Sequence, residues 1–105
     1  MSNLVGVSEA AAILGWSRGK VSVYNGRGLL PKPVTRLTTG PVWRREDIVA
    51  WSVRWLLGIE DPVAERQRIV TTYGLHAEAP IGAQLHAQGI LSEEQGEWLD
   101  REVSG

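Results

Sequence analysis

The sequence predicts a mainly helical fold that carries one small β-hairpin. Two short helix-like segments flank Gly15-Trp16-Ser17, and a β-prone stretch is interrupted by turn residues at 38–41. Several later segments begin with residues that cap helices. The length of 105 residues suits one small domain or a domain with a short appendage.

The first two predicted helices are short and are joined by a tight turn. Ser8 is the expected N-cap of the first helix, and Gly15 suits the position that follows its last turn. Ser17 is the expected N-cap of the second helix, which we place at about Arg18–Arg27. The order is therefore helix, tight turn, helix.

A hairpin and a third helix follow. Val34–Leu37 and Val42–Arg44 are the expected strands, joined by the turn at 38–41. The third helix is expected at about Glu46–Leu57, with acidic residues in its first turn, where the helix dipole favours them. It carries two apolar stripes, which predict a helix covered on two sides: Ile48, Trp51 and Trp55 form one, and Val49, Val53 and Leu56 the other.

The best candidate for a domain boundary is the segment 58–62, which divides the chain into a head (1–58) and a helical extension (59–105). Asp61 as N-cap and Pro62 at the first helical position predict a helix that continues to Tyr73. A short helix is expected between Pro80 and Gly89. The pair Ser92 and Gln95 forms a capping box for a last helix, whose apolar face is Leu91, Trp98, Leu99 and Val103.

Charge is divided unevenly along the chain, although the net charge is only −1. Residues 1–57 hold eight Lys and Arg against three Asp and Glu, whereas residues 58–105 hold three against nine. This asymmetry favours a basic half that meets a polyanion and an acidic half that faces elsewhere.

Helix, tight turn, helix, hairpin, helix is the order of a winged helix-turn-helix, whose second helix reads the DNA major groove. With Val21 and Tyr24 turned inward, the second helix presents the candidate base contacts Arg18, Gly19, Ser22 and Val23. The candidate backbone or wing contacts are Ser17, Lys20, Arg27, Arg36, Thr38, Thr39 and Arg44. We therefore expect sequence-specific binding to double-stranded DNA, as in a transcriptional regulator.

The stretch VSEAAAILGWSRGKVSVYNGRGLLPKPVTRLTTGPVWRREDIVAW resembles the MerR-like winged-helix group that includes AlpA-type regulators and excisionases. The matching parts are the S-E-A-A-x-x-L-G opening, Ser17-Arg18, Gly28 with Leu30-Pro31, the segment 40–43 and the segment 45–51. The resemblance covers about residues 5–57 and implies a DNA-binding head. The sequence departs from the group at Trp16 and at Asn25-Gly26, where we expect the second helix to fray early.

The role of the acidic half stays open among fold completion, homodimerisation and recruitment of another protein. Dimerisation would use Val49, Val53, Leu56 and the C-terminal helices. Two alternative functions also stand. One is an architectural DNA-binding factor of the excisionase or phage-packaging kind, and the other is a protein-interaction module that acts through the acidic helices.

Catalytic and metal-binding patterns are absent from the sequence. It has no nucleophile elbow, no phosphate-binding glycine loop and no HExxH motif, so we expect neither an enzyme nor a cofactor. His76, Glu78 and His86 match no zinc spacing, and the chain has no Cys. We expect Trp16 and Trp98 to be exposed interface residues. No signal peptide or membrane-spanning helix is expected, which favours a cytoplasmic protein associated with a bacterial nucleoid, a phage or a plasmid.

Overall fold

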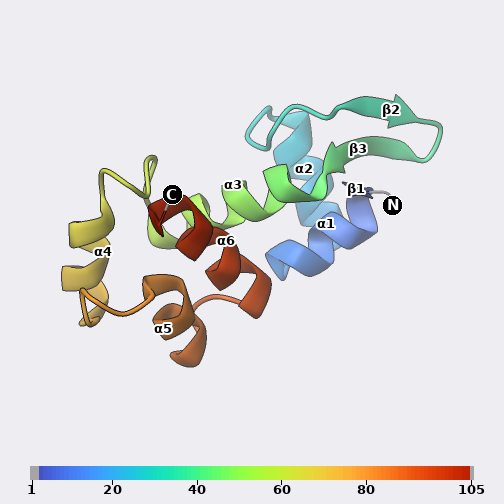
Figure 1. The fold of residues 1–105 in the computed structure, drawn as a ribbon. Helices are drawn as coiled ribbons and strands as arrows, with labels where there is room; N and C mark the ends of the chain where they lie inside the picture. The colour runs from blue at the N-terminus through green and yellow to red at the C-terminus, as the bar shows by residue number, and fades with distance from the viewer. Residues whose placement is uncertain (1–2, 105) are drawn as a thin grey trace. The chain divides into compact units, whose positions relative to one another are not determined.

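The computed structural model describes residues 3–104, which form a mainly helical chain with a small antiparallel sheet (Figure 1). In chain order the elements are β1 (Leu4–Val5), α1 (Val7–Leu14), α2 (Arg18–Gly26), β2 (Thr35–Leu37), β3 (Gly40–Arg44), α3 (Arg45–Leu57), α4 (Arg66–Tyr73), α5 (Ile81–Ala87) and α6 (Glu93–Ser104). The chain divides into two compact units. The first ends at Trp51 and the second begins at Ser52, so the division falls inside α3, upstream of the boundary expected at 58–62.

The core of the first unit joins its helices to its sheet. Val21 of α2, Trp43 of β3 and Ile48 of α3 are fully buried there. The indole Nε1 of Trp43 donates a 2.7 Å hydrogen bond to the carbonyl oxygen of Pro31, which satisfies the one polar group of this large side chain. Trp43 therefore anchors the hairpin to the helices.

The sheet has the strand order β1-β3-β2, and both pairings are antiparallel. Strand β1 has no counterpart among the predicted elements because it has only two residues, and its partner β3 lies far along the sequence. Its register places Leu4 opposite Arg44 and Val5 opposite Trp43. Because side chains alternate between the two faces of a strand, Val5 and Trp43 share the face that enters the core.

The cap of α1 differs from the expectation. The N-cap is Gly6, not Ser8, and the Gly6 N–H donates to the Glu9 carboxylate at 3.3 Å. Ser8 lies in the first turn of α1, and its hydroxyl has no capping role. The end of α1 is as predicted, because Gly15 occupies the left-handed conformation with φ 70°.

Helix α2 begins as predicted and does not fray early. The Ser17 hydroxyl accepts a 3.1 Å hydrogen bond from the Lys20 N–H, which makes Ser17 the N-cap. The helix continues through Asn25 to Gly26, and the C-cap Arg27 donates from its N–H to the carbonyl of Val23. The early fraying expected at Asn25-Gly26 is therefore wrong. The continued hydrogen bonds outweigh the weak helix propensity of these two residues.

The two apolar stripes predicted for α3 are only partly buried. Ile48 is fully buried and Trp51 half-buried, but Trp55 and Leu56 are 49% and 46% exposed. Val49 and Val53 are already buried within the single chain. Only Leu56 of the three residues named for dimerisation therefore remains on the surface.

After α3, the second unit continues with turns rather than with the helix expected from Pro62. The Asp61 carboxylate accepts from the N–H groups of Val63 and Ala64, as a cap does, but residues 62–65 form turns. Helix α4 starts only at Arg66, later than predicted. The Glu65 carboxylate accepts from the N–H groups of Glu60 and Asp61 at 2.8 and 3.0 Å, which draws the chain back on itself. That local loop replaces the first turn of the expected helix.

Helices α5 and α6 pack closely and carry the predicted capping box. Ser92 and Gln95 exchange hydrogen bonds of 2.8 and 3.1 Å, as expected. The Gln95 amide also donates to the buried hydroxyl of Ser52 at 2.9 Å. Trp98 is only 3% exposed, so its expected role as a surface interface residue is wrong. Its indole ring lies under the Arg54 guanidinium, 5.1 Å from the ring centroid.

Candidate nucleic-acid interface

One side of α2 is open to solvent and carries the predicted base-contacting residues. Arg18, Gly19, Ser22 and Val23 are all exposed, and Val23 has half of its surface free. Residues four apart share a helix face, so Arg18 lies above Ser22 and Gly19 above Val23. Val21 lies opposite and is fully buried. The burial pattern thus places the four predicted residues together on one continuous helix face.

Gly19 keeps this face flat near the start of α2. A Cβ atom at Gly19 would meet only the Ser17 hydroxyl, at 3.9 Å. The backbone of α2 is therefore open to solvent at this position.

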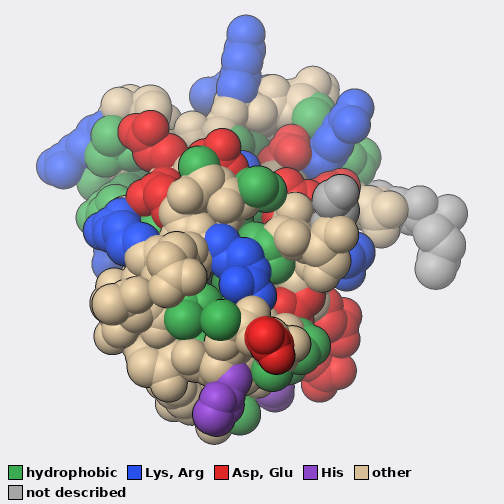
Figure 2. All heavy atoms as spheres, turned by 60° about the vertical axis from the view of Figure 1, so that its left-hand side comes forward, with side chains coloured by type: hydrophobic (Ala, Val, Ile, Leu, Met, Phe, Trp, Pro, Cys, Tyr) green, Lys and Arg blue, Asp and Glu red, His purple; other side chains and the backbone are tan. Residues whose placement is uncertain are grey.

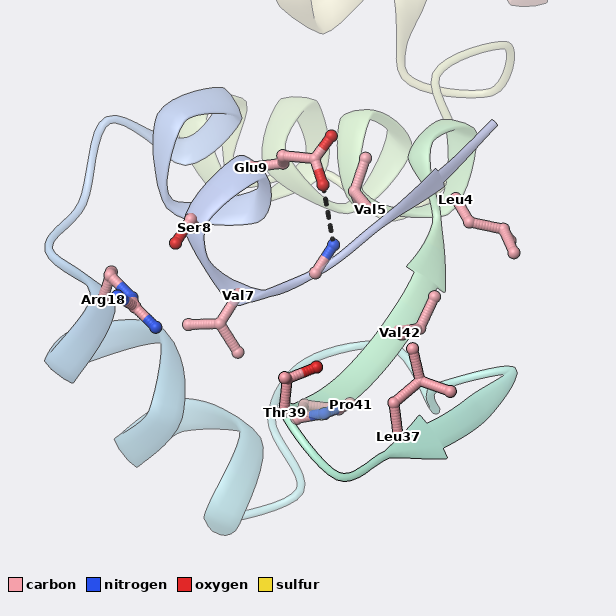
Figure 3. Close-up of a pocket in the computed structure, with 11 residues that line it drawn as sticks. Leu4, Val5, Val7, Ser8, Glu9, Arg18, Leu37, Thr39, Pro41 and Val42 are labelled. Carbon is pink, nitrogen blue, oxygen red and sulfur yellow. Dashed lines mark hydrogen bonds between the residues drawn. The ribbon is translucent and has the colours of Figure 1, made fainter. Parts of the chain in front are cut away.

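A pocket of about 450 Å³ lies beside α2 (Figure 3). Arg18 enters it from the first turn of α2 and points toward Val7 of α1, while Leu37 and Thr39 come from the hairpin. Ser8, which does not cap α1, contributes a hydroxyl to the same lining. The pocket thus brings one cation and two hydroxyl groups from three separate elements around partly apolar walls.

The lining also contains a carboxylate, Glu9, whose Oε1 accepts from the Gly6 N–H. Ser8 and Val7 are not among the contact residues predicted from the sequence. No local pattern could identify them, because their place beside the hairpin depends on how β1 pairs with β3.

The hairpin does not present all of its predicted contacts on one face. Arg36 is paired with Pro41, whereas Thr35 is paired with Val42. Paired residues share a face of the sheet, so Arg36 lies on the same face as Pro41. Arg44 follows Pro41 by three positions on β3, and side chains alternate along a strand, so Arg44 lies on the opposite face. Thr38 and Thr39 are exposed in the turn between the strands. A ligand on one face of the sheet therefore meets one of the two arginines.

The remaining predicted contacts border α2. Ser17 and Lys20 lie at its N-terminal end, where free N–H groups favour an anion. Arg27 is exposed at the opposite end, as the C-cap. Lys20 does not extend freely into solvent, because its ammonium lies over the Trp16 ring.

The acidic excess of the second unit does not form one uniform field on the face seen in Figure 2, where Asp and Glu alternate with Lys and Arg. Between residues 3 and 104, no three His, Asp or Glu side chains are grouped to hold a metal ion. None of the described helices is both long enough and apolar enough to span a membrane.

Comparison with protein-family models, with curated proteins and with solved structures finds no match to this chain.

Proposed function

We propose that the first unit binds double-stranded DNA as a winged helix-turn-helix, with α2 in the major groove and the β2–β3 hairpin as the wing. The observation that carries this proposal is the exposed face of α2, where Arg18, Gly19, Ser22 and Val23 lie together beside the hairpin. Arginine pairs with guanine, serine with several bases, and valine with the thymine methyl group. A regulator that recognises a defined DNA sequence is the function that fits this set best.

The pocket supports the same docking. A duplex whose major groove held α2 would pass its sugar-phosphate backbone between α2 and the wing. Ser8 and Thr39 offer hydroxyls to phosphate oxygens there, beside Arg18 on the reading face, and the apolar walls suit a deoxyribose ring. The negative charge of the Glu9 carboxylate repels a phosphate. One of its oxygens, however, already accepts a hydrogen bond from the Gly6 N–H.

The first test is selection from a randomised duplex pool, followed by sequencing, at two salt concentrations. An enriched motif supports a sequence-reading regulator. Salt-sensitive binding without enrichment favours an architectural DNA-binding role instead. Absence of binding at low salt contradicts the proposal and favours the alternative function, a protein-interaction module that acts through the acidic second unit.

Arg18→Ala is the variant that tests the reading face. At an enriched site it should cost about 1–3 kcal/mol of binding free energy and relax the preference at one base position. Arg101→Ala, at an exposed position on α6 in the second unit, is the matched control and should leave binding unchanged. An equal loss with every DNA sequence would assign Arg18 to a phosphate rather than to a base.

A further inference from the structure

Trp16, in the turn before α2, lies close to Lys20 and Tyr24 of α2. The Lys20 ammonium lies 4.3 Å from the centroid of the Trp16 ring and 5.6 Å from that of Tyr24. Both distances are within the range of cation–π attraction. The Lys20 ammonium thus lies over two neighbouring aromatic rings, although its residue is exposed.

The aromatic rings are themselves fixed. The centroids of Trp16 and Tyr24 are 4.7 Å apart, with a tilt of 54° between the rings. The ring of Trp51, from α3, forms a T-shaped pair with Trp16, with the centroids 5.7 Å apart and the ring planes at 87°. All three rings are half-buried against the core of the first unit. Trp16, which the sequence suggested as an exposed interface residue, instead forms a platform for Lys20.

The contacts with Trp16 and Tyr24 fix the position of the Lys20 ammonium relative to Arg18. The two residues are separated by about 200° around α2, because each residue advances the helix by about 100°. Arg18 borders the exposed face on the side of the pocket, and Lys20 borders it on the side of Tyr24. A helix in the major groove has one phosphate strand on each side. Lys20 therefore lies on the side of α2 away from the pocket and the wing.

We propose that Trp16 is a positioning residue that holds the Lys20 ammonium in place for a phosphate of the strand on the side away from the wing. This inference rests on the proposed DNA binding. A free lysine loses much rotamer freedom when it docks on a phosphate, and a lysine already ordered over an indole ring loses less. The ring attracts the ammonium without accepting all of its N–H donors, so these remain for phosphate oxygens.

The arrangement in the free protein is tested by NMR without any DNA. Protons above an aromatic ring are shielded, so the ε-methylene protons of Lys20 should resonate upfield of those of Lys32, an exposed lysine of the same unit. Trp16→Phe should keep part of this shift and Trp16→Leu should remove it. Equal shifts for Lys20 and Lys32 in the wild-type protein would overturn the positioning role.

The contribution to DNA binding is tested by a double-mutant cycle on an enriched duplex. Lys20→Met should reduce the slope of log K against log salt by about 0.9, the value for one phosphate contact. Trp16→Leu should weaken binding about 2- to 5-fold, the size of an exposed cation–π contact, and Trp16→Phe should restore part of that loss. In the Lys20→Met background, Trp16→Leu should have no further effect.

The outcomes separate this inference from the proposed function. An equal loss from Trp16→Leu in both backgrounds would show a purely structural role for the indole ring. Stronger binding by Trp16→Leu would show that the ring withholds Lys20 from DNA, and would also overturn the inference. Absence of wild-type DNA binding overturns the phosphate contact together with the proposed function, whereas the Lys20 proton shifts still report the geometry.

Discussion

At the scale of single residues, the Glu65 carboxylate stabilises the loop that stands where a first turn of helix was expected. It accepts hydrogen bonds from the N–H groups of Glu60 and Asp61, and it forms a 2.7 Å ion pair with Arg68. The two backbone hydrogen bonds, followed by Arg68, hold the pKa of Glu65 below the ordinary value of 4.5. The ionised form therefore stabilises the loop that leads into α4.

The pH dependence of stability follows from the direction of this shift. Because the folded pKa is below the unfolded one, the contribution of Glu65 is complete above pH 4.5 and is lost as the pH falls through the folded pKa. We expect Glu65→Gln to lower the free energy of unfolding at neutral pH and to match the wild-type protein increasingly well in acid. Urea unfolding over a pH series measures this difference.

Glu97→Gln, at an exposed position of α6, is the control for this series. The prediction fails if Glu65→Gln destabilises the protein equally at every pH, because the loss would then not depend on the ionised carboxylate.

At the scale of elements, α5 and α6 approach so closely that only glycine fits at their crossing. A Cβ atom on Gly82 would lie 2.0 Å from the carbonyl oxygen of Gly96, and one on Gly96 would lie 2.6 Å from that of Gly82. The Asp100 carboxylate of α6 accepts from the N–H groups of Gly82 and Ala83, at 2.7 and 3.0 Å, and so caps α5. The close approach and the cap depend on each other, because both need the two backbones in contact.

Gly82→Ala should therefore destabilise the second unit. The new methyl group would meet backbone atoms, which cannot rotate away, so we expect a loss of at least about 1–3 kcal/mol in the free energy of unfolding. Chemical denaturation followed by helical circular dichroism measures it.

The control is Gly19→Ala on α2, where the new methyl group has free space. Alanine favours helix over glycine, so this variant should be slightly more stable than the wild-type protein. Wild-type stability for Gly82→Ala would contradict the tight crossing.

At the scale of the whole molecule, the chain consists of two units with opposite charge character. Most of the Lys and Arg precede residue 52, and most of the Asp and Glu follow it. The sequence pI of about 6.1 reflects the charges of both units together, so it does not indicate that the first unit is basic. Association with DNA depends on cations near the phosphates rather than on net charge, since salt screens charges more than about 8–10 Å apart.

Two substitutions with the same effect on net charge test this localisation. Arg36→Gln on the hairpin should weaken DNA binding and lower the salt slope by about 0.9, as expected for one lost phosphate contact. Arg101→Gln on α6 should leave both quantities unchanged. Salt-dependent binding assays on one duplex measure the two slopes, and equal effects would show that only the total charge matters.

Structure that depends on nearby residues was predictable from the sequence. The Ser17 cap, the left-handed Gly15 and the Ser92–Gln95 capping box all depend on hydrogen bonds or backbone angles within a few residues. The exposed face of α2 was predictable for the same reason, because helical periodicity places the exposed Val23 about 160° around the helix from the buried Val21.

Features that join distant segments were decided only by the tertiary structure. Strand β1 exists because β3 pairs with it, and that pairing brings Ser8 and the hairpin to one pocket. Trp98 is buried and Trp55 exposed, although both are tryptophans on helices with apolar stripes. Local sequence indicated which segments become helices and where most of them begin or end, although α1 and α4 begin elsewhere than expected. Packing between distant segments determined which side chains meet, because burial depends on the partner that covers a face and not on the face alone.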